Sequence, residues 1–156
     1  YYRLYTFSTM NRFIDAFSEM MREYGSLTEF VRQSVNDAKC ISAVEAITSW
    51  FAARGIEGVI PKNIQSSCKR VCMFMRWMVR SDSPVDLGLW SDIIDRRTLI
   101  MPMDTHVVQQ SMRLNLLASS STSMSAAQRL TSAMSLVFPD DPLKGDFALF
   151  GYGVNN

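Results

Sequence analysis

Residues 99–114 read LIMPMDTHVVQQSMRL, an apolar run followed by an aspartate and an amphipathic pattern. After Asp104, the apolar residues Val107, Val108 and Met112 recur at the spacing of one helix face. Aspartate is a favoured N-cap because its carboxylate accepts hydrogen bonds from the free amides of the first turn. The stretch therefore predicts a helix from about residue 104, with the Asp104 carboxylate held at its N-terminus.

The sequence on both sides of this stretch also has helical patterns. Ser-x-x-Glu capping boxes begin at Ser26 and Ser42, and a Ser-x-x-Gln box begins at Ser125. Asp141-Pro142 has the residue types favoured at the N-cap and the first helical position. No alternating strand pair flanks a hairpin turn, so the expected fold class is all-α. The expected helices cover approximately residues 10–24, 27–35, 43–54, 67–80, 104–116, 125–138 and the stretch from 142.

Length and composition indicate one globular domain. A chain of 156 residues is about one domain's worth, and a hydrophobic content of 47% excludes a disordered or fibrous protein. No run approaches the roughly 20 apolar residues of a membrane helix. The start, Tyr1-Tyr2-Arg3, has neither an initiator Met nor a signal-peptide pattern. We expect a soluble, compact multi-helix domain over residues 1–156 that lacks an N-terminal segment.

Three cysteines and one histidine restrict the possible chemistry. Cys40, Cys68 and Cys72 are an odd number within helical sequence, which favours a reducing compartment such as the cytoplasm. With His106 as the one histidine, a four-ligand zinc site is not expected, and the cysteines are too few for an iron–sulfur cluster. The sequence also lacks a Gly-x-Ser-x-Gly turn and a Gly-rich phosphate loop. We therefore expect neither a metal nor a cofactor.

Positive charge is concentrated in one segment. Five of the 16 basic residues lie between Gly58 and Ser81, where no acidic residue occurs, so the rest of the chain carries 11 basic and 15 acidic residues. Within this segment, Lys69 falls in the first turn of the helix expected near residue 67. The positive end of the helix dipole and the neighbouring Arg70 both favour the neutral amine of Lys69 over the ammonium. A neutral lysine is a nucleophile for carbonyl-like carbon.

Two segments of the chain resemble the helix-hairpin-helix DNA glycosylase superfamily. The stretch around Asp104-Thr-His106 is similar to the family's Val-Asp-Thr-His-Val segment, whose Asp is the catalytic carboxylate. Residues 60–69, IPKNIQSSCK, occupy the place of the family hairpin, whose final Lys is the nucleophile of members that also cleave the backbone. The resemblance assigns these roles to Asp104 and Lys69. Gln65 and Ser67 stand where the family has hairpin glycines.

A second resemblance covers nearly the whole chain. The motifs that carry it look like a bacterial family of uncharacterised proteins, a domain of unknown function and a remote branch of the glycosylases. The 35 residues between Lys69 and Asp104 exceed the usual glycosylase spacing, and this longer insert, Arg80 to Leu99, resembles that of the archaeal oxidised-guanine glycosylases. The motifs are YYRLY (1–5), CKRVCMFMRWMVR (68–80), VDLGLW (85–90), MDTH (103–106) and DFALFG (146–151).

These resemblances imply a repair enzyme that acts on damaged double-stranded DNA in the bacterial cytoplasm, at the nucleoid. The implied activity is excision of an oxidised purine such as 8-oxoguanine, with strand cleavage through a Lys69 Schiff base. The expected hairpin region is about 58–81. The DNA-binding candidates are Lys62, Ser66, Ser67, Arg70 and Arg76, and the base-pocket candidates are Trp77, Trp90 and His106, with Trp50 as a further aromatic.

Two alternatives belong to other classes of protein. One is a nucleic-acid-binding module that has the same fold and no chemistry. The other is a helical protein-interaction domain, for which the 11 methionines would supply an adaptable surface.

Overall fold

The structure is a computed structural model that describes residues 5–81 and 83–155. Within these residues it contains seven α-helices, one 3₁₀ turn and no strand longer than an isolated bridge, so the all-α prediction is confirmed. The Tyr1–Leu4 part of the first motif lies outside the described residues. The helices are α1 (Phe7–Tyr24), α2 (Leu27–Ser34), α3 (Cys40–Ala52), α4 (Lys69–Val79), the 3₁₀ turn η1 (Arg96–Thr98), α5 (Thr105–Arg113), α6 (Met124–Ser135) and α7 (Lys144–Asn155).

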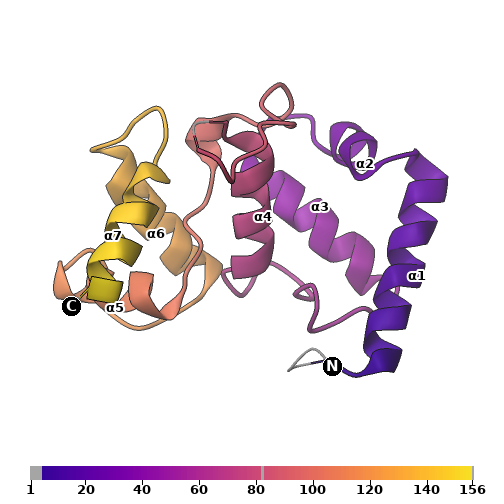
Figure 1. Cartoon of the computed structure of the whole chain (residues 1–156), viewed down its shortest axis with the longest axis horizontal. Helices are drawn as coiled ribbons and strands as arrows, with labels where there is room; N and C mark the ends of the chain where they lie inside the picture. Colours follow the sequence, from indigo (N-terminus) through magenta and orange to yellow (C-terminus); the bar gives the residue numbers. More distant parts are fainter. Residues whose placement is uncertain (1–4, 82, 156) are drawn as a thin grey trace.

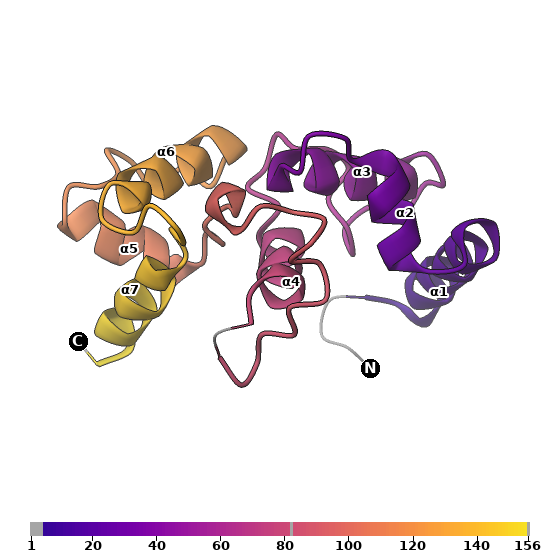
Figure 2. The same cartoon turned by 90° about the horizontal axis from the view of Figure 1, so that it is seen from above.

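Helix α4 stands in the middle of the molecule, with α1 to α3 on one side and α5 to α7 on the other (Figure 1). The view from above has the same order, and α5 packs along α7 (Figure 2). One side of α4 buries Val71, Cys72, Met75 and Val79 in the core. No helix among the described residues has the length and apolarity that a membrane crossing requires.

Several predicted helix ends are confirmed by their hydrogen bonds. Ser26 Oγ accepts from the Glu29 amide at 3.0 Å, as the capping box predicted for α2. Helix α1 ends at Gly25, whose φ of 78° is favourable for glycine and strained for other residues. The start of α1 lies earlier than the pattern predicted, because Thr6 accepts from the Thr9 amide.

Three predicted starts are displaced. Helix α3 begins at Cys40, so Ser42 lies inside it and donates to Asp37 instead of capping at the predicted box. Helix α6 begins at Met124, because Ser123 and not Ser125 accepts from a first-turn amide. Asp141 accepts from the Leu143 amide, but in a turn that precedes α7. Each segment offers several short polar side chains, and tertiary contacts select among them.

Candidate active site

Lys69 is the first residue of α4, within the turn in which the sequence placed it. The preceding residue, Cys68, has a left-handed backbone with φ of 48° and no side-chain capping bond. The Lys69 side chain is exposed, and it forms no ion pair with any residue that the structure describes. Its amine is therefore accessible at the N-terminus of the central helix.

Asp104 is the N-cap of α5, as predicted. Its Oδ1 accepts from the Val107 amide at 2.7 Å, and the residue is half-buried. Its second carboxylate oxygen has no hydrogen-bond partner within residues 5–81 and 83–155. The capping bond fixes the orientation of the carboxylate and leaves one oxygen available to a ligand.

A chain of contacts connects the face of α4 that bears Lys69 with α5 and α7. Arg76 lies seven residues after Lys69, about two turns further along the same face. Its Nη1 donates to Asp146 Oδ2 of α7 at 2.6 Å, and its guanidinium lies 4.1 Å from the centre of the Phe147 ring. The charge of Asp104 in turn acts on Asp146. In both overall views α5 and α7 lie on the side of α4 that is opposite α1 (Figures 1 and 2). This arrangement is compatible with a Lys69–Asp104 pair. We expect the two side chains to lie within about one substrate sugar of each other, and this separation stays a prediction.

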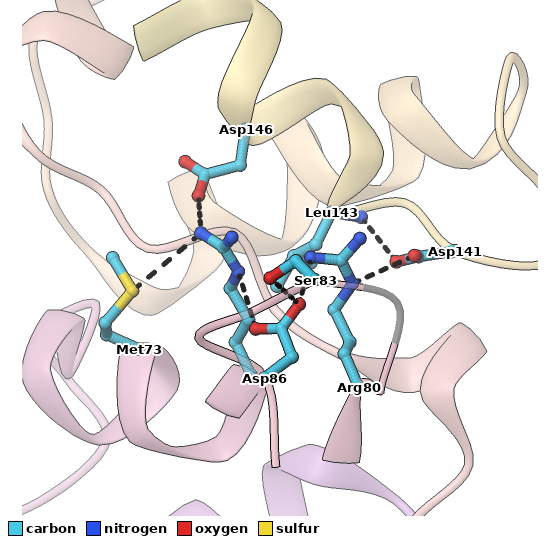
Figure 3. Close-up of polar contacts among 8 residues, drawn as sticks. Met73, Arg80, Ser83, Asp86, Asp141, Leu143 and Asp146 are labelled. Atoms are coloured by element: carbon cyan, nitrogen blue, oxygen red, sulfur yellow. Dashed lines mark hydrogen bonds and ion pairs between the residues drawn. The ribbon is translucent and has the colours of Figure 1, made fainter. Parts of the chain in front are cut away.

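Arg76 and Arg80 belong to a buried ionic network (Figure 3). Arg80 Nε donates to Asp141 Oδ2 at 2.9 Å, and its Nη1 donates to Asp86 Oδ2 at 3.0 Å. Arg76 Nε and Asp86 Oδ1 are 3.8 Å apart, and neither atom has a hydrogen-bond partner. The network thus joins α4, the loop that follows it and the start of α7.

Burial in this network affects both the predicted role of Arg76 and the charge balance of the carboxyl groups around it. Arg76 is only 4% exposed, so its predicted contact with DNA phosphate does not fit its position. Three buried carboxyl groups share two guanidinium groups here, which leaves an excess of negative charge. Burial raises the pKa of Asp146, and the nearby Asp104 acts in the same direction, against the opposing effect of Arg76. The sequence identified the two arginines and missed their partners Asp86, Asp141 and Asp146.

The predicted hairpin region is a series of turns that leads into α4. The Ser67 amide donates to the Thr122 carbonyl at 2.8 Å, and the Met124 amide donates to the Gln65 carbonyl at 3.2 Å. Ser66 and Ser123 form the antiparallel bridge between these two segments. The Ser67 amide is therefore occupied, and the residue is buried, which does not fit its predicted phosphate contact.

Three polar residues predicted at DNA remain on the surface of this region. Lys62 lies 3.1 Å from Glu57, and both side chains are exposed. Arg70 is exposed and donates from Nη1 to the Gly58 and Val59 carbonyls at 3.0 and 3.5 Å. Ser66 is also exposed.

The predicted base-pocket residues separate into buried and exposed groups. Trp90 is fully buried, and its Nε1 donates to Thr28 Oγ1 at 2.9 Å, so a pocket role does not fit it. Trp50 is covered by the Arg54 guanidinium, 3.3 Å from its ring centre. Trp77 is 42% exposed on α4. His106 is exposed and makes an edge contact with Phe150 of α7.

The cysteines are buried and free. Burial raises the pKa of Cys40 to about 12 and raises the pKa values of Cys68 and Cys72 as well, so none of them is suited to act as a thiolate. Within the described part of the chain, no group of three or more His, Cys, Asp or Glu side chains is placed to hold a metal ion.

Sequence reasoning missed the aromatic residues of α7. Phe147 and Phe150 are about half exposed and contact Arg76 and His106, respectively. Both belong to the DFALFG motif, which was noted for its resemblance and was given no role in the site.

Over residues 1–155 the chain matches a family described as "Protein of unknown function (DUF2400)". No curated protein and no solved structure matches the chain.

Proposed function

The chain belongs to the DUF2400 family of unknown function, and we propose that it is a DNA glycosylase that also cleaves the backbone at the excised site. The observations that support this proposal are an accessible lysine at the start of α4 and an ordered carboxylate at the start of α5, whose approach to each other stays a prediction. Lys69 begins α4, Asp104 caps α5, and the Arg76–Asp146 bond joins the Lys69-bearing face of α4 to α7, which packs on α5.

The proposed chemistry uses one amine and one carboxylate. The Lys69 amine attacks the anomeric carbon of the deoxyribose, and the bond to the damaged base breaks with its electron pair leaving on the base. The Asp104 carboxylate offsets positive charge at the sugar and accepts the proton that the attacking amine loses. Opening of the sugar ring gives a Schiff base, which permits elimination of the 3′ phosphate. An oxidised purine is the proposed substrate class, because the longer insert between Lys69 and Asp104 resembles that of the archaeal oxidised-guanine glycosylases.

The proposed DNA contact lies at the surface of residues 58–70. Lys62, Ser66 and Arg70 are exposed there, beside the N-terminus of α4. Basic side chains and helix N-termini are common phosphate contacts and fix the register of a protein on a duplex. Trp77, Phe147, Phe150 and His106 are the exposed rings available to an extruded base.

A second candidate function is a protein-interaction domain. Val85, Leu87 and Leu89 are each more than half exposed, and the Leu87 amide bonds to the carbonyl of the exposed Trp77. Fixed, exposed apolar side chains are typical of contact surfaces between proteins.

Borohydride trapping on duplex DNA with one abasic site tests the enzyme directly. Wild type is expected to give a covalent adduct on a denaturing gel, because borohydride reduces the Schiff base to a stable amine. Lys69→Gln is expected to give none while it still binds the duplex. Lys62→Gln is the matched control, since it removes one exposed lysine charge from the same region and leaves the nucleophile intact.

Three results would contradict parts of the proposal. Adduct formation by Lys69→Gln at the wild-type level would remove Lys69 from the nucleophile role. Duplex binding without any adduct in wild type would favour a non-catalytic module. Absence of both would favour the interaction domain.

A further inference from the structure

A cavity of about 390 Å³ lies between α1, α2, α3 and α4. Its walls are almost entirely apolar and rich in aromatic rings. The lining residues are Phe13 and Phe17 of α1, Leu27 of α2, Ile47 and Phe51 of α3, Val59 and Ile60 of the turns before α4, and Arg70, Val71 and Phe74 of α4.

This space is poorly suited to water. It exceeds many times the about 10–15 Å³ that one water needs, but a stable water also requires two to four polar partners. Among the described residues of the lining, Arg70 is the one charged or polar side chain. An apolar occupant that removed these walls from water would be stabilising, roughly in proportion to the apolar area that it covers. Its size lies within the range of small-molecule sites.

The positive charge of Arg70 favours an occupant with a negatively charged group. One of its nitrogens, Nη1, bonds to the Gly58 and Val59 carbonyls, which holds the guanidinium at the wall of the cavity. The Tyr5 ring lies 5.6 Å from the guanidinium, and the Tyr5 hydroxyl donates to the same Gly58 carbonyl. Two carbonyl contacts do not neutralise the cation. Its remaining donors suit a carboxylate or sulfonate group.

We propose that this cavity binds a small amphiphilic anion, with its apolar body among the phenylalanines and its anionic group at Arg70. Arg70 is one residue after Lys69, so their side chains leave α4 about 100° apart, and Phe74 continues the Arg70 side one turn later. The cavity is therefore separate from the proposed Lys69 nucleophile, although Arg70 also belongs to the proposed DNA contact, and the test of ligand binding uses no DNA.

The first experiment measures whether the anionic group matters. The protein is titrated with 1-anilinonaphthalene-8-sulfonate, whose fluorescence rises in apolar sites, and the bound probe is displaced by dodecyl compounds below their micelle concentrations. Saturable binding is expected, and dodecanoate should displace the probe at about three- to tenfold lower concentration than dodecanol or dodecyltrimethylammonium. Non-saturable binding, or equal displacement by all three compounds, would overturn the proposal.

The second experiment places the ligand. Ile47→Trp fills the cavity from α3 and Val59→Trp fills it from the rim, and at least about a tenfold loss of probe affinity is expected in each variant that retains wild-type circular dichroism. Val137→Trp is the matched control at an exposed valine, and it should bind like wild type. Arg70→Gln should bring dodecanoate to the level of dodecanol, whereas Lys62→Gln should not. Unchanged binding in a folded cavity-filling variant would refute the assignment.

Discussion

At the scale of single residues, Asp104 combines a structural role with a proposed chemical one, and the two can be separated. Its Oδ1 accepts from the Val107 amide, and asparagine offers the same acceptor geometry. We expect Asp104→Asn to change the free energy of unfolding by less than about 1 kcal/mol, measured by urea denaturation. Base release from an oxidised-guanine duplex should fall by about 10²-fold or more, because an amide neither offsets positive charge nor accepts the proton.

The control for this variant is Asp104→Ala, which also removes the cap. It should lose the same activity and, in addition, about 1 kcal/mol of stability. Retention of full activity by the asparagine variant would show that the carboxylate has only its capping role.

At the scale of elements, the N-cap of α6 gives a matched pair of neighbouring serines. Ser123 Oγ accepts from the Ala126 amide at 3.2 Å, whereas Ser125 lies inside the helix. Ser123→Ala should destabilise the protein by about 1 kcal/mol in urea denaturation. Ser125→Ala should be within about 0.5 kcal/mol of wild type, since alanine has the higher helix propensity. A larger loss of stability in Ser125→Ala than in Ser123→Ala would instead support the helix start at Ser125 that the sequence predicted.

The basic segment makes a prediction about binding. Lys62→Glu and Arg70→Glu should each weaken duplex binding and reduce its salt dependence, because fewer counterions are released from phosphates. Arg22→Glu and Arg129→Glu, outside residues 58–81, should have little effect in fluorescence anisotropy titrations at several salt concentrations. Equal losses in all four variants would indicate general electrostatic attraction without a defined site.

Local sequence patterns predicted the helices well because capping and amphipathicity act within a few residues. Asp104 and Ser26 were identified as caps for this reason. Patterns of the same kind failed where long-range contacts decide. The positive charge of residues 58–81 indicated a basic surface, but Arg76 and Arg80 find carboxylates up to 70 residues away and turn inward. Trp90 likewise finds Thr28, 62 residues away. No local signal distinguishes such a buried arginine or tryptophan from an exposed one.

At the scale of the whole molecule, the buried network fixes α4 to the loop that follows it and to the start of α7. Arg76 and Arg80 leave α4 and bind carboxylates of the following loop, of the turn before α7 and of α7 itself. Removing one partner from such a network leaves a buried charge uncompensated. For Asp146, however, burial disfavours the charged carboxylate by more than the bond to Arg76 offsets, so Asp146→Asn, which keeps an oxygen acceptor for Arg76, should change the free energy of unfolding at neutral pH by less than about 1 kcal/mol.

The same residue predicts an unusual pH dependence. Because burial raises the pKa of Asp146 in the folded state, the folded protein takes up this proton at higher pH than the unfolded chain does. Lowering the pH from neutral to below the ordinary aspartate pKa of 3.8 should therefore stabilise wild type relative to Asp146→Asn. The measurement is urea denaturation of both proteins across that range.

Asp92 provides a control, because its pKa is lowered whereas the pKa of Asp146 is raised. Its bond to Arg32 lowers the pKa of this exposed carboxyl group, so its stabilising contribution is present above pH 3.8 and is lost as the pH falls through the lowered value. Wild type should thus lose stability relative to Asp92→Asn on acidification, while it gains stability relative to Asp146→Asn. If both differences changed with pH in the same direction, burial would not dominate the pKa of Asp146, and Arg76 would hold Asp146 as an ordinary ion pair.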